Sequence, residues 1–169
     1  MRFTNQTQIH PAVAVFLATD NYDYNPNTIS ATALLKPLRQ LILSKRIPKE
    51  QQVMDIASMV KSRIGAAIHD SIEQSWVTNY HQALQALGYS AQFIERVKVN
   101  PTEEAPEDFA IYLEQRLYKD VGAYKIAGKF DIVMDGEVQD FKYTGVFTIL
   151  NGVKDDDYVM QGSIYRWLD

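Results

Sequence analysis

Apolar positions change their spacing near residue 100 of the chain. Before that point they recur mostly at intervals of three and four, which places them on one face of a helix. After the acidic linker at 100–108, which contains two prolines, they alternate with polar positions, as is typical of strands with one buried face. We therefore expect residues 1–99 to be mainly helical and residues 109–169 to form a sheet core and a closing helix.

Capping and breaking residues divide the helical part. Thr28 or Ser30 can cap a helix, and Pro37 should either kink this helix or move its start. A longer helical pattern covers 51–87 and has Gly88 as a plausible C-cap. Because this pattern exceeds the length of a usual globular helix, we expect a bend or a break near Gly65 or within 76–79.

The alternating part predicts three antiparallel strands. They fall in 109–114, 125–134 and 138–148, where apolar and β-branched positions alternate with polar ones. Acidic residues at 155–157 favour the N-terminus of a closing helix that begins at about Tyr158. The expected fold class is therefore mixed α/β (α+β), with a three-stranded antiparallel sheet flanked by helices.

Length and composition narrow the chemistry. A chain of 169 residues fits one domain over 1–169, and it is long enough to bury a hydrophobic core without stabilisation by covalent cross-links. Because the chain contains no cysteine, disulfides, Cys-ligated zinc, iron–sulfur clusters and thiol catalysis are excluded. The sequence shows no membrane span and no signal-peptide pattern, so we expect a cytoplasmic protein.

The distribution of charge is more informative than its total. The net charge is −4, so bulk positive charge cannot drive binding to nucleic acid. Basic residues nevertheless gather between positions 36 and 49, and this run is either a solvated helix face or a phosphate-binding patch. The candidates for phosphate contact are Lys36, Arg39, Lys45 and Arg46.

A hairpin signal places two carboxylates opposite each other. Asp135-Gly136 is a favoured pair for a two-residue type I′ turn, and a turn centred there pairs Asp131 with Asp140. Lys142 projects from the same face as Asp140 because side chains alternate along a strand. Two opposed carboxylates repel each other unless one is protonated or a cation lies between them, so the pattern favours a divalent metal site.

A second hairpin adds a third carboxylate. If its turn centres near Gly122 and Ala123, Glu114 comes opposite Asp131. Oxygen ligands favour Mg²⁺ or Mn²⁺, and a lysine such as Lys142 can orient a water or offset charge on a phosphorus centre. A metal ion held by carboxylates beside a lysine suits the hydrolysis of phosphodiester bonds. The simpler alternative is a surface hairpin whose charged residues have no common function.

Four short motifs follow one another along the chain. They are Gly65-Ala66-Ala67-Ile68-His69, Gly128-Lys129-Phe130-Asp131, Asp140-Phe141-Lys142 and Gln161-Gly162-Ser163-Ile164-Tyr165. In this order they resemble the motifs of the PD-(D/E)XK nuclease superfamily, and in particular those of its RecB-like exonuclease branch of phage type. The resemblance runs from about residue 29 to the end of the chain, and it implies a restriction-endonuclease-like core.

The resemblance also implies roles for individual residues. Metal ligands would be His69, Asp131, Asp140 and the backbone carbonyl of Phe141. Lys142 would be the catalytic lysine, and Glu114 joins Asp131 and Asp140 as a catalytic carboxylate candidate. Gln161 and Tyr165, one helical turn apart, would help to bind substrate.

The function implied is that of a Mg²⁺- or Mn²⁺-dependent deoxyribonuclease, with an exonuclease of recombination, repair or phage replication favoured. The alternatives are a structure-specific endonuclease and a catalytically silent DNA-binding or assembly module. Duplex or single-stranded DNA is the expected partner, and a recombination or replication protein and an oligomeric state would suit this role. No nucleotide-binding loop of the Walker type occurs in the sequence, so no nucleotide cofactor is expected.

Overall fold

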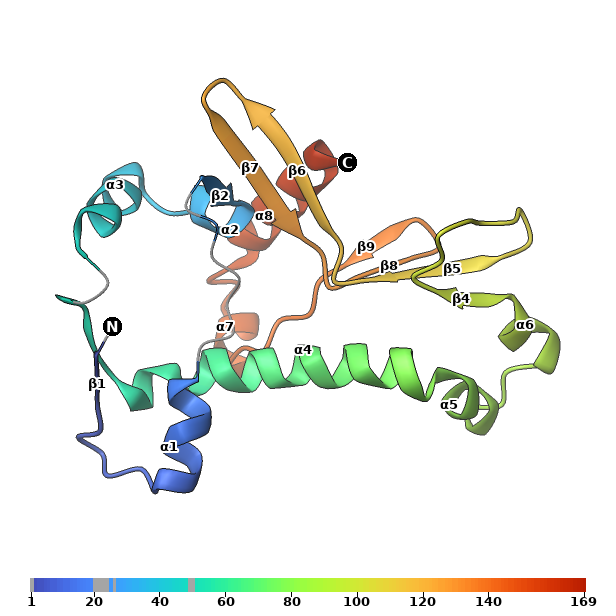
Figure 1. The fold of residues 1–169 in the computed structure, drawn as a ribbon, viewed down its shortest axis with the longest axis horizontal. Helices are drawn as coiled ribbons and strands as arrows, with labels where there is room; N and C mark the ends of the chain where they lie inside the picture. The colour runs from blue at the N-terminus through green and yellow to red at the C-terminus, as the bar shows by residue number, and fades with distance from the viewer. Residues whose placement is uncertain (1, 20–24, 26, 49–50) are drawn as a thin grey trace. The chain divides into compact units, whose positions relative to one another are not determined.

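The computed structural model describes residues 2–19, 25, 27–48 and 51–169, and its fold is mixed α/β, as predicted (Figure 1). The helices are α1 (Pro11–Ala18), α2 (Ala31–Leu34), α3 (Leu38–Arg46), η2 (Ile56–Met59, a 3-10 helix), α4 (Val60–Thr78), α5 (Tyr80–Ala86), α6 (Ala91–Arg96), α7 (Val146–Leu150) and α8 (Asp155–Leu168). Among the described residues, none of these helices is long and apolar enough to cross a bilayer.

The strands of the described residues form small sheets rather than one large sheet. They are β1 (Arg2–Thr4), β2 (Thr28–Ser30), β3 (Val53–Asp55), β4 (Val97–Val99), β5 (Phe109–Leu113), β6 (Arg116–Val121), β7 (Tyr124–Lys129), β8 (Ile132–Met134) and β9 (Glu137–Gln139). The strand orders are β1-β3, β2-β7-β6 and β4-β5-β8-β9.

The chain divides into two compact units. Unit 1 comprises Met1–Gly65, Leu117–Gly128 and Tyr143–Asp169, and unit 2 comprises Ala66–Arg116 and Lys129–Lys142. This division into compact units does not test whether residues 1–169 fold as one domain, so the single domain stays a prediction.

Local chemistry explains where the helices of unit 1 begin. The Ser30 hydroxyl accepts a hydrogen bond from the Ala33 N–H at 3.2 Å and caps α2. Pro37 then separates α2 from α3 and takes the N-cap position of α3, so the predicted interruption at this proline is confirmed. Asp55 ends β3 and caps η2, and hydrogen bonds from the backbone of Gln6 and Ala57 lower its pKa.

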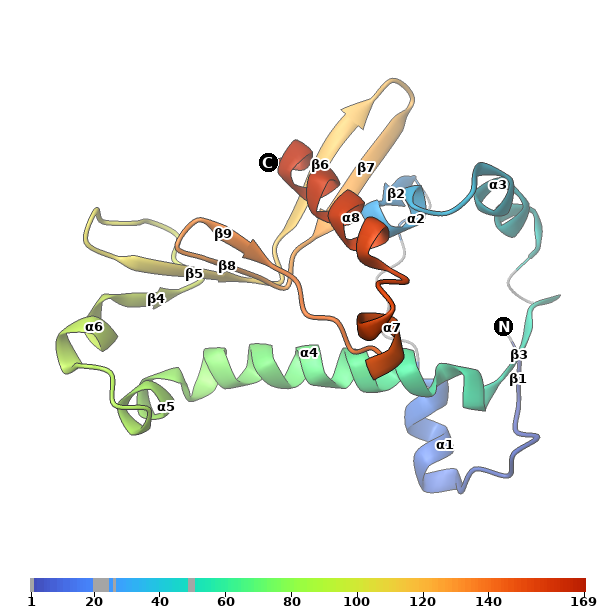
Figure 2. The ribbon, with the colours of Figure 1, turned by 180° about the vertical axis from the view of Figure 1, so that it is seen from behind.

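In unit 1, α8 packs against the β6–β7 hairpin (Figure 2). Gly128 makes this approach feasible, because a Cβ at that position would lie 2.5 Å from Leu168 Cδ1 and 3.0 Å from Tyr165 Cδ1. The Lys119 ammonium donates to the Trp167 carbonyl at 2.6 Å on the same interface. The closing helix is therefore confirmed, and its first turn holds the acidic residues 155–157, three positions earlier than expected.

Unit 2 has the core on which the candidate site is built. Ile111 and Ile132 from neighbouring strands are almost fully buried against Val97 of β4 and the helical residues Leu84 and Ile94. Burial of these apolar side chains is the main force holding the sheet to α5 and α6. Rings of Trp76, Tyr80, Phe93, Phe109 and Phe141 pack around this cluster.

The predicted antiparallel neighbours are present as β5, β8 and β9, but the predicted count of three strands is wrong for this sheet. The sheet of unit 2 has four strands, and β4 pairs in parallel with β5. Three residues of β4 are too few to produce a recognisable alternation, and β6 is largely polar and exposed, so neither strand was visible as a hydrophobic pattern.

The predicted strand over 138–148 is also wrong beyond Gln139, where β9 ends. The Phe141 N–H donates to the Asp131 carboxylate at 2.6 Å, so it is not available to a neighbouring strand. Val146–Leu150 instead forms α7, although its β-branched and aromatic residues favour a strand. In the first part of the chain, the short strand β3 interrupts the expected helical pattern, because its partner β1 is distant in sequence.

Candidate metal centre

The β8–β9 hairpin positions the first two carboxylates. Asp135 and Gly136 both have positive φ angles, 52° and 73°, as a type I′ turn requires. The strands pair Ile132 with Gln139, so the next residues beyond the ladder are Asp131 and Asp140. The register predicted from the Asp-Gly pair is confirmed, and the two acidic residues lie at the open end of the hairpin.

The β5–β8 pairing positions the third carboxylate. Leu113 is the partner of Ile132, and just beyond this pair the Glu114 N–H donates to the Asp131 carbonyl at 3.0 Å. The Phe130 N–H donates to the Gln115 carbonyl at 2.8 Å, so the pairing continues past the strand ends. Glu114 therefore stands opposite Asp131, as the second predicted register requires.

Glu114 has an unusual backbone conformation. Its φ angle is 53°, in the left-handed region that residues with a Cβ rarely adopt. The residue lies where β5 ends and β6 begins, and the two flanking hydrogen bonds to 131 and from 130 hold it there. A backbone outlier at a carboxylate of this cluster is consistent with a functional role, because surrounding structure must offset its cost.

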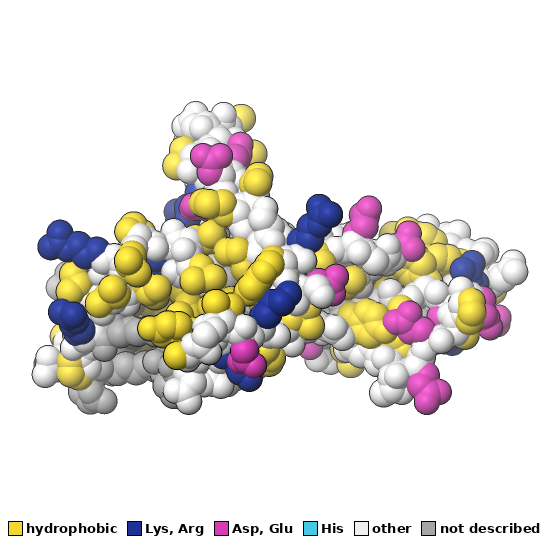
Figure 3. Space-filling model, turned by 90° about the horizontal axis from the view of Figure 1, so that it is seen from above, with side chains coloured by type: hydrophobic (Ala, Val, Ile, Leu, Met, Phe, Trp, Pro, Cys, Tyr) yellow, Lys and Arg dark blue, Asp and Glu magenta, His cyan; other side chains and the backbone are white. Residues whose placement is uncertain are grey.

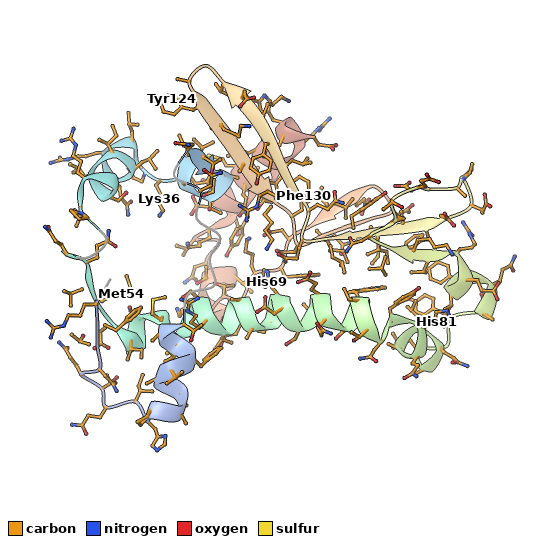
Figure 4. The ribbon with its side chains drawn as sticks, viewed as in Figure 1. Lys36, Met54, His69, His81, Tyr124 and Phe130 are labelled. Atoms are coloured by element: carbon orange, nitrogen blue, oxygen red, sulfur yellow. The ribbon has the colours of Figure 1, made fainter. Side chains whose placement is uncertain are left out.

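Helix α4 supplies an imidazole to the same place. Figure 4 labels His69 on α4, and its Nδ1 lies 3.0 Å from Asp131 Oδ1. The His69 ring meets the Phe141 ring edge to face, with 6.2 Å between the ring centres, which holds the imidazole in position. One ligand atom each from His69, Glu114 and Asp131 lies within 4.8 Å of the other two.

Asp131 is the electrostatic centre of the cluster. Its side chain is only 12% exposed. Burial raises the pKa of Asp131, and the charges of Asp140 and Glu114 raise it further, while the Phe141 N–H and His69 act in the opposite direction. An ionised Asp131 is thus disfavoured in this environment, and a cation among the carboxylates would relieve both the burial cost and the repulsion.

Two lysines neutralise the outer carboxylates. Lys142 forms an ion pair with Asp140, and Lys129 forms an ion pair with Glu114. Lys142 was predicted as the catalytic lysine, and the structure places its ammonium beside one of the predicted metal ligands. The candidate metal centre is hereafter the set His69, Glu114, Asp131 and Asp140, with Lys129 and Lys142 at its edge.

Lys129 has no role among the residues predicted from the sequence. Its position could have been found, because it is two residues before Asp131 and therefore on the same strand face. In the predicted register Lys129 is a diagonal neighbour of Glu114, a spacing that long side chains can bridge.

The remaining predicted residues belong to unit 1. Gln161 and Tyr165 are buried, and the Gln161 amide donates to the Tyr165 hydroxyl, so they share one face of α8 as expected. Their contribution to substrate binding stays a prediction.

Among the basic candidates, Lys36, Arg39 and Arg46 are exposed, whereas the side chain of Lys45 lies outside the described part of the chain. On the face that Figure 3 shows, Lys and Arg side chains are interspersed with hydrophobic and uncharged ones. Phosphate contact by these four residues stays a prediction.

Comparisons with models of known protein families, with curated proteins and with solved structures found no match.

The donor set fits a hard divalent cation. Carboxylate oxygens are the preferred ligands of Mg²⁺ and Mn²⁺, and Mn²⁺ also accepts an imidazole. The two other carboxyl groups, Glu114 and Asp140, lie near the largely buried Asp131, and each of them forms an ion pair with a lysine. A site of this kind can bind a metal and an anionic substrate together.

Proposed function

We propose that this protein is a Mg²⁺- or Mn²⁺-dependent nuclease that hydrolyses phosphodiester bonds in DNA, and that it acts as an exonuclease. The observation that carries the proposal is the convergence of His69, Glu114 and Asp131 with the Asp140–Lys142 pair. Two independent strand registers and one helix bring these residues together, and the acid-x-Lys spacing just after the end of β9 supports the resemblance to the PD-(D/E)XK nucleases.

The proposed roles follow from the chemistry of each group. His69, Asp131 and Asp140 would hold the metal together with the Phe141 carbonyl, and Glu114 would complete the carboxylate cluster. A bound divalent cation would supply Lewis-acid stabilisation of phosphate charge. Lys142 would orient the attacking water or stabilise charge that develops on the phosphate. A restriction-endonuclease-like arrangement of the β4-β5-β8-β9 sheet belongs to this proposal.

A nuclease assay with end-labelled DNA tests the proposal. Linear duplex and single-stranded DNA are incubated with the full chain in Mg²⁺, Mn²⁺ or EDTA, with Asp140→Asn as the inactive control. We expect stepwise shortening from the ends in either metal and none in EDTA. Binding without cleavage in both metals would contradict the proposal and would favour the catalytically silent DNA-binding module.

Covalently closed circular DNA separates the two kinds of nuclease. An exonuclease leaves this substrate intact because it has no ends, whereas a structure-specific endonuclease cuts it. Cleavage of the circle at a rate similar to that of the linear duplex would replace the exonuclease with the endonuclease and leave the metal centre unchanged.

A further inference from the structure

The ion pair between Lys129 and Glu114 occupies the candidate metal centre itself. Glu114 is one of the three residues whose ligand atoms cluster, and its side chain is only 19% exposed. Lys129 reaches it from a position that is 47% exposed. An ammonium group therefore neutralises a carboxylate that the proposed function assigns to a metal-binding cluster.

This lysine and a metal ion compete for the same charge. A divalent cation beside Glu114 would repel the Lys129 ammonium, because two cations cannot neutralise one carboxylate without strong mutual repulsion. Lys129 has a flexible stem of four methylene groups and is partly exposed, so it can leave Glu114 without any change in the backbone. Metal binding therefore costs one ion pair and releases one positive charge at the edge of the centre.

The released ammonium needs an anion close to the metal. A nucleic-acid substrate brings one there, because a phosphate that contacts the metal presents further negatively charged oxygens to its surroundings. Lysine is a common phosphate ligand, since it is a compact point charge with three donors. Lys142 is less suited to this exchange. It pairs with Asp140 of the acid-x-Lys motif, and the proposed function already assigns Lys142 to orienting the attacking water or stabilising charge on the phosphate.

We propose that Lys129 is a substrate-binding residue that changes partners: it pairs with Glu114 in the free protein, and it pairs with a backbone phosphate once a metal ion bound beside Glu114 has displaced it. The proposal rests on the proposed nuclease function and adds a coupling to it. Metal binding frees the lysine for phosphate, and phosphate binding removes the lysine from the metal site, so each ligand increases the affinity for the other.

Lys125 provides a matched control on the same strand. It is also 47% exposed and forms an ion pair, at 3.6 Å, with Asp120, whose side chain is 77% exposed. Lys125→Gln removes the same charge from β7 as Lys129→Gln, but it leaves the candidate metal centre intact. Lys129→Arg keeps the charge and tests whether charge alone is required.

Mn²⁺ affinity is measured first, by calorimetry on the 169-residue chain without DNA. Lys129→Gln should bind Mn²⁺ roughly three- to tenfold more tightly than the wild type, because no ion pair has to be broken. Lys125→Gln and Lys129→Arg should remain within about twofold of the wild type. Thermal unfolding in EDTA confirms that each variant is folded.

DNA affinity is then measured by fluorescence anisotropy with a short duplex that carries phosphorothioate linkages, in EDTA and in saturating Mn²⁺. Mn²⁺ should tighten binding in the wild type and in Lys125→Gln. The ratio of DNA affinity in Mn²⁺ to DNA affinity in EDTA should be roughly three- to tenfold smaller in Lys129→Gln than in the wild type, because the variant lacks the lysine that would bind the phosphate.

The outcomes distinguish this proposal from the proposed function. If the wild type and all variants fail to bind Mn²⁺, the metal centre is wrong, and both the proposed nuclease function and the partner exchange of Lys129 are overturned. If the wild type binds Mn²⁺ and Lys129→Gln behaves like Lys125→Gln, the exchange is overturned and the nuclease proposal stands. If Lys129→Gln binds Mn²⁺ more tightly but keeps the wild-type ratio of DNA affinities, Lys129 is a counterion only and its transfer to phosphate is overturned.

Discussion

At the scale of single residues, Asp131 combines several opposing influences. It is largely buried, it lies near two other carboxylates, and it accepts the Phe141 N–H and contacts His69. The net effect raises its pKa above the ordinary value of 3.8, with burial as the first cause. Such an arrangement weakens the metal-free fold and favours a bound cation, which is the trade-off expected at a functional site.

The raised pKa of Asp131 makes its contribution to stability depend on pH. Between pH 3.8 and the raised value, the folded state keeps a proton that the unfolded state has lost, so stability falls as pH rises through that window. Asp131→Asn removes this effect, since an amide stays neutral and its oxygen can still accept the Phe141 N–H. In EDTA at pH 7 the variant should therefore melt at a higher temperature than the wild type.

The measurement is a series of thermal melts in EDTA from pH 3.5 to 7, with the advantage of Asp131→Asn growing as the pH rises. In millimolar Mn²⁺ the order should reverse, because the wild type gains stability from binding and the variant loses a ligand. An advantage that is the same at every pH would show that the carboxylate is not the source.

Lys142 separates catalysis from metal binding at one residue. Its ammonium pairs with Asp140 and carries no lone pair for a metal, so Lys142→Ala should leave Mn²⁺ stabilisation intact or increase it. Single-turnover cleavage should fall by roughly 10²–10³-fold, the usual cost of removing one electrostatic stabiliser, while DNA affinity measured in Ca²⁺ barely changes. Cleavage at the wild-type rate would mean that the acid-x-Lys spacing has no catalytic role.

At the scale of elements, the turn between β8 and β9 determines where the carboxylates lie. A slip of one residue in this hairpin would move Asp131 and Asp140 out of opposition, and it would turn Ile132 away from the core. The left-handed conformation at Gly136, with φ at 73°, is therefore a requirement of the site and not only of the hairpin.

Gly136→Ala tests this requirement. A Cβ at a φ of 73° costs about 1 kcal/mol even though no atom lies within 4 Å of it, so the variant should melt lower and bind Mn²⁺ more weakly than the wild type. Gly145→Ala is the matched control, because Gly145 is equally open but has a φ of −75° that alanine adopts freely. Equal melting temperatures and Mn²⁺ affinities in the two variants would contradict the role assigned to the turn.

At the scale of the whole molecule, the net charge of −4 opposes binding to DNA. If DNA is the substrate, a local group of basic residues must attract its phosphates, and the basic residues between 36 and 46 form such a group in the sequence. We expect them to bind phosphates, and neutralising them should weaken binding equally for all sequences. The slope of log affinity against log salt should become less steep by about 0.9 for each phosphate that the variant no longer neutralises.

The test compares two variants with the same change in net charge. The first replaces the basic candidates with glutamine, at Lys36, Arg39, Lys45 and Arg46. The control replaces exposed lysines elsewhere, at Lys61, Lys98, Lys125 and Lys154. If both variants flatten the salt dependence equally, the basic run at 36–46 is a solvated face without a specific role.

The sequence by itself determined the registers that build the candidate metal centre. Asp135-Gly136 selects a two-residue turn, and alternation with period two then settles which residues oppose each other from Met134 back to Asp131. Glu114 follows from the same logic in the neighbouring pair of strands. These features were predictable because turn chemistry and strand alternation act between residues that are close in the chain.

Only the tertiary structure decided the features that depend on distant partners. β4 is a strand because β5 lies beside it, and Val146–Leu150 is helical although its composition favours a strand. The predicted register already makes Lys129 a diagonal neighbour of Glu114, but only the folded structure shows that the two side chains form an ion pair. Short segments have weak local preferences, so the free energy of burial and of pairing with remote residues exceeds them and selects the final conformation.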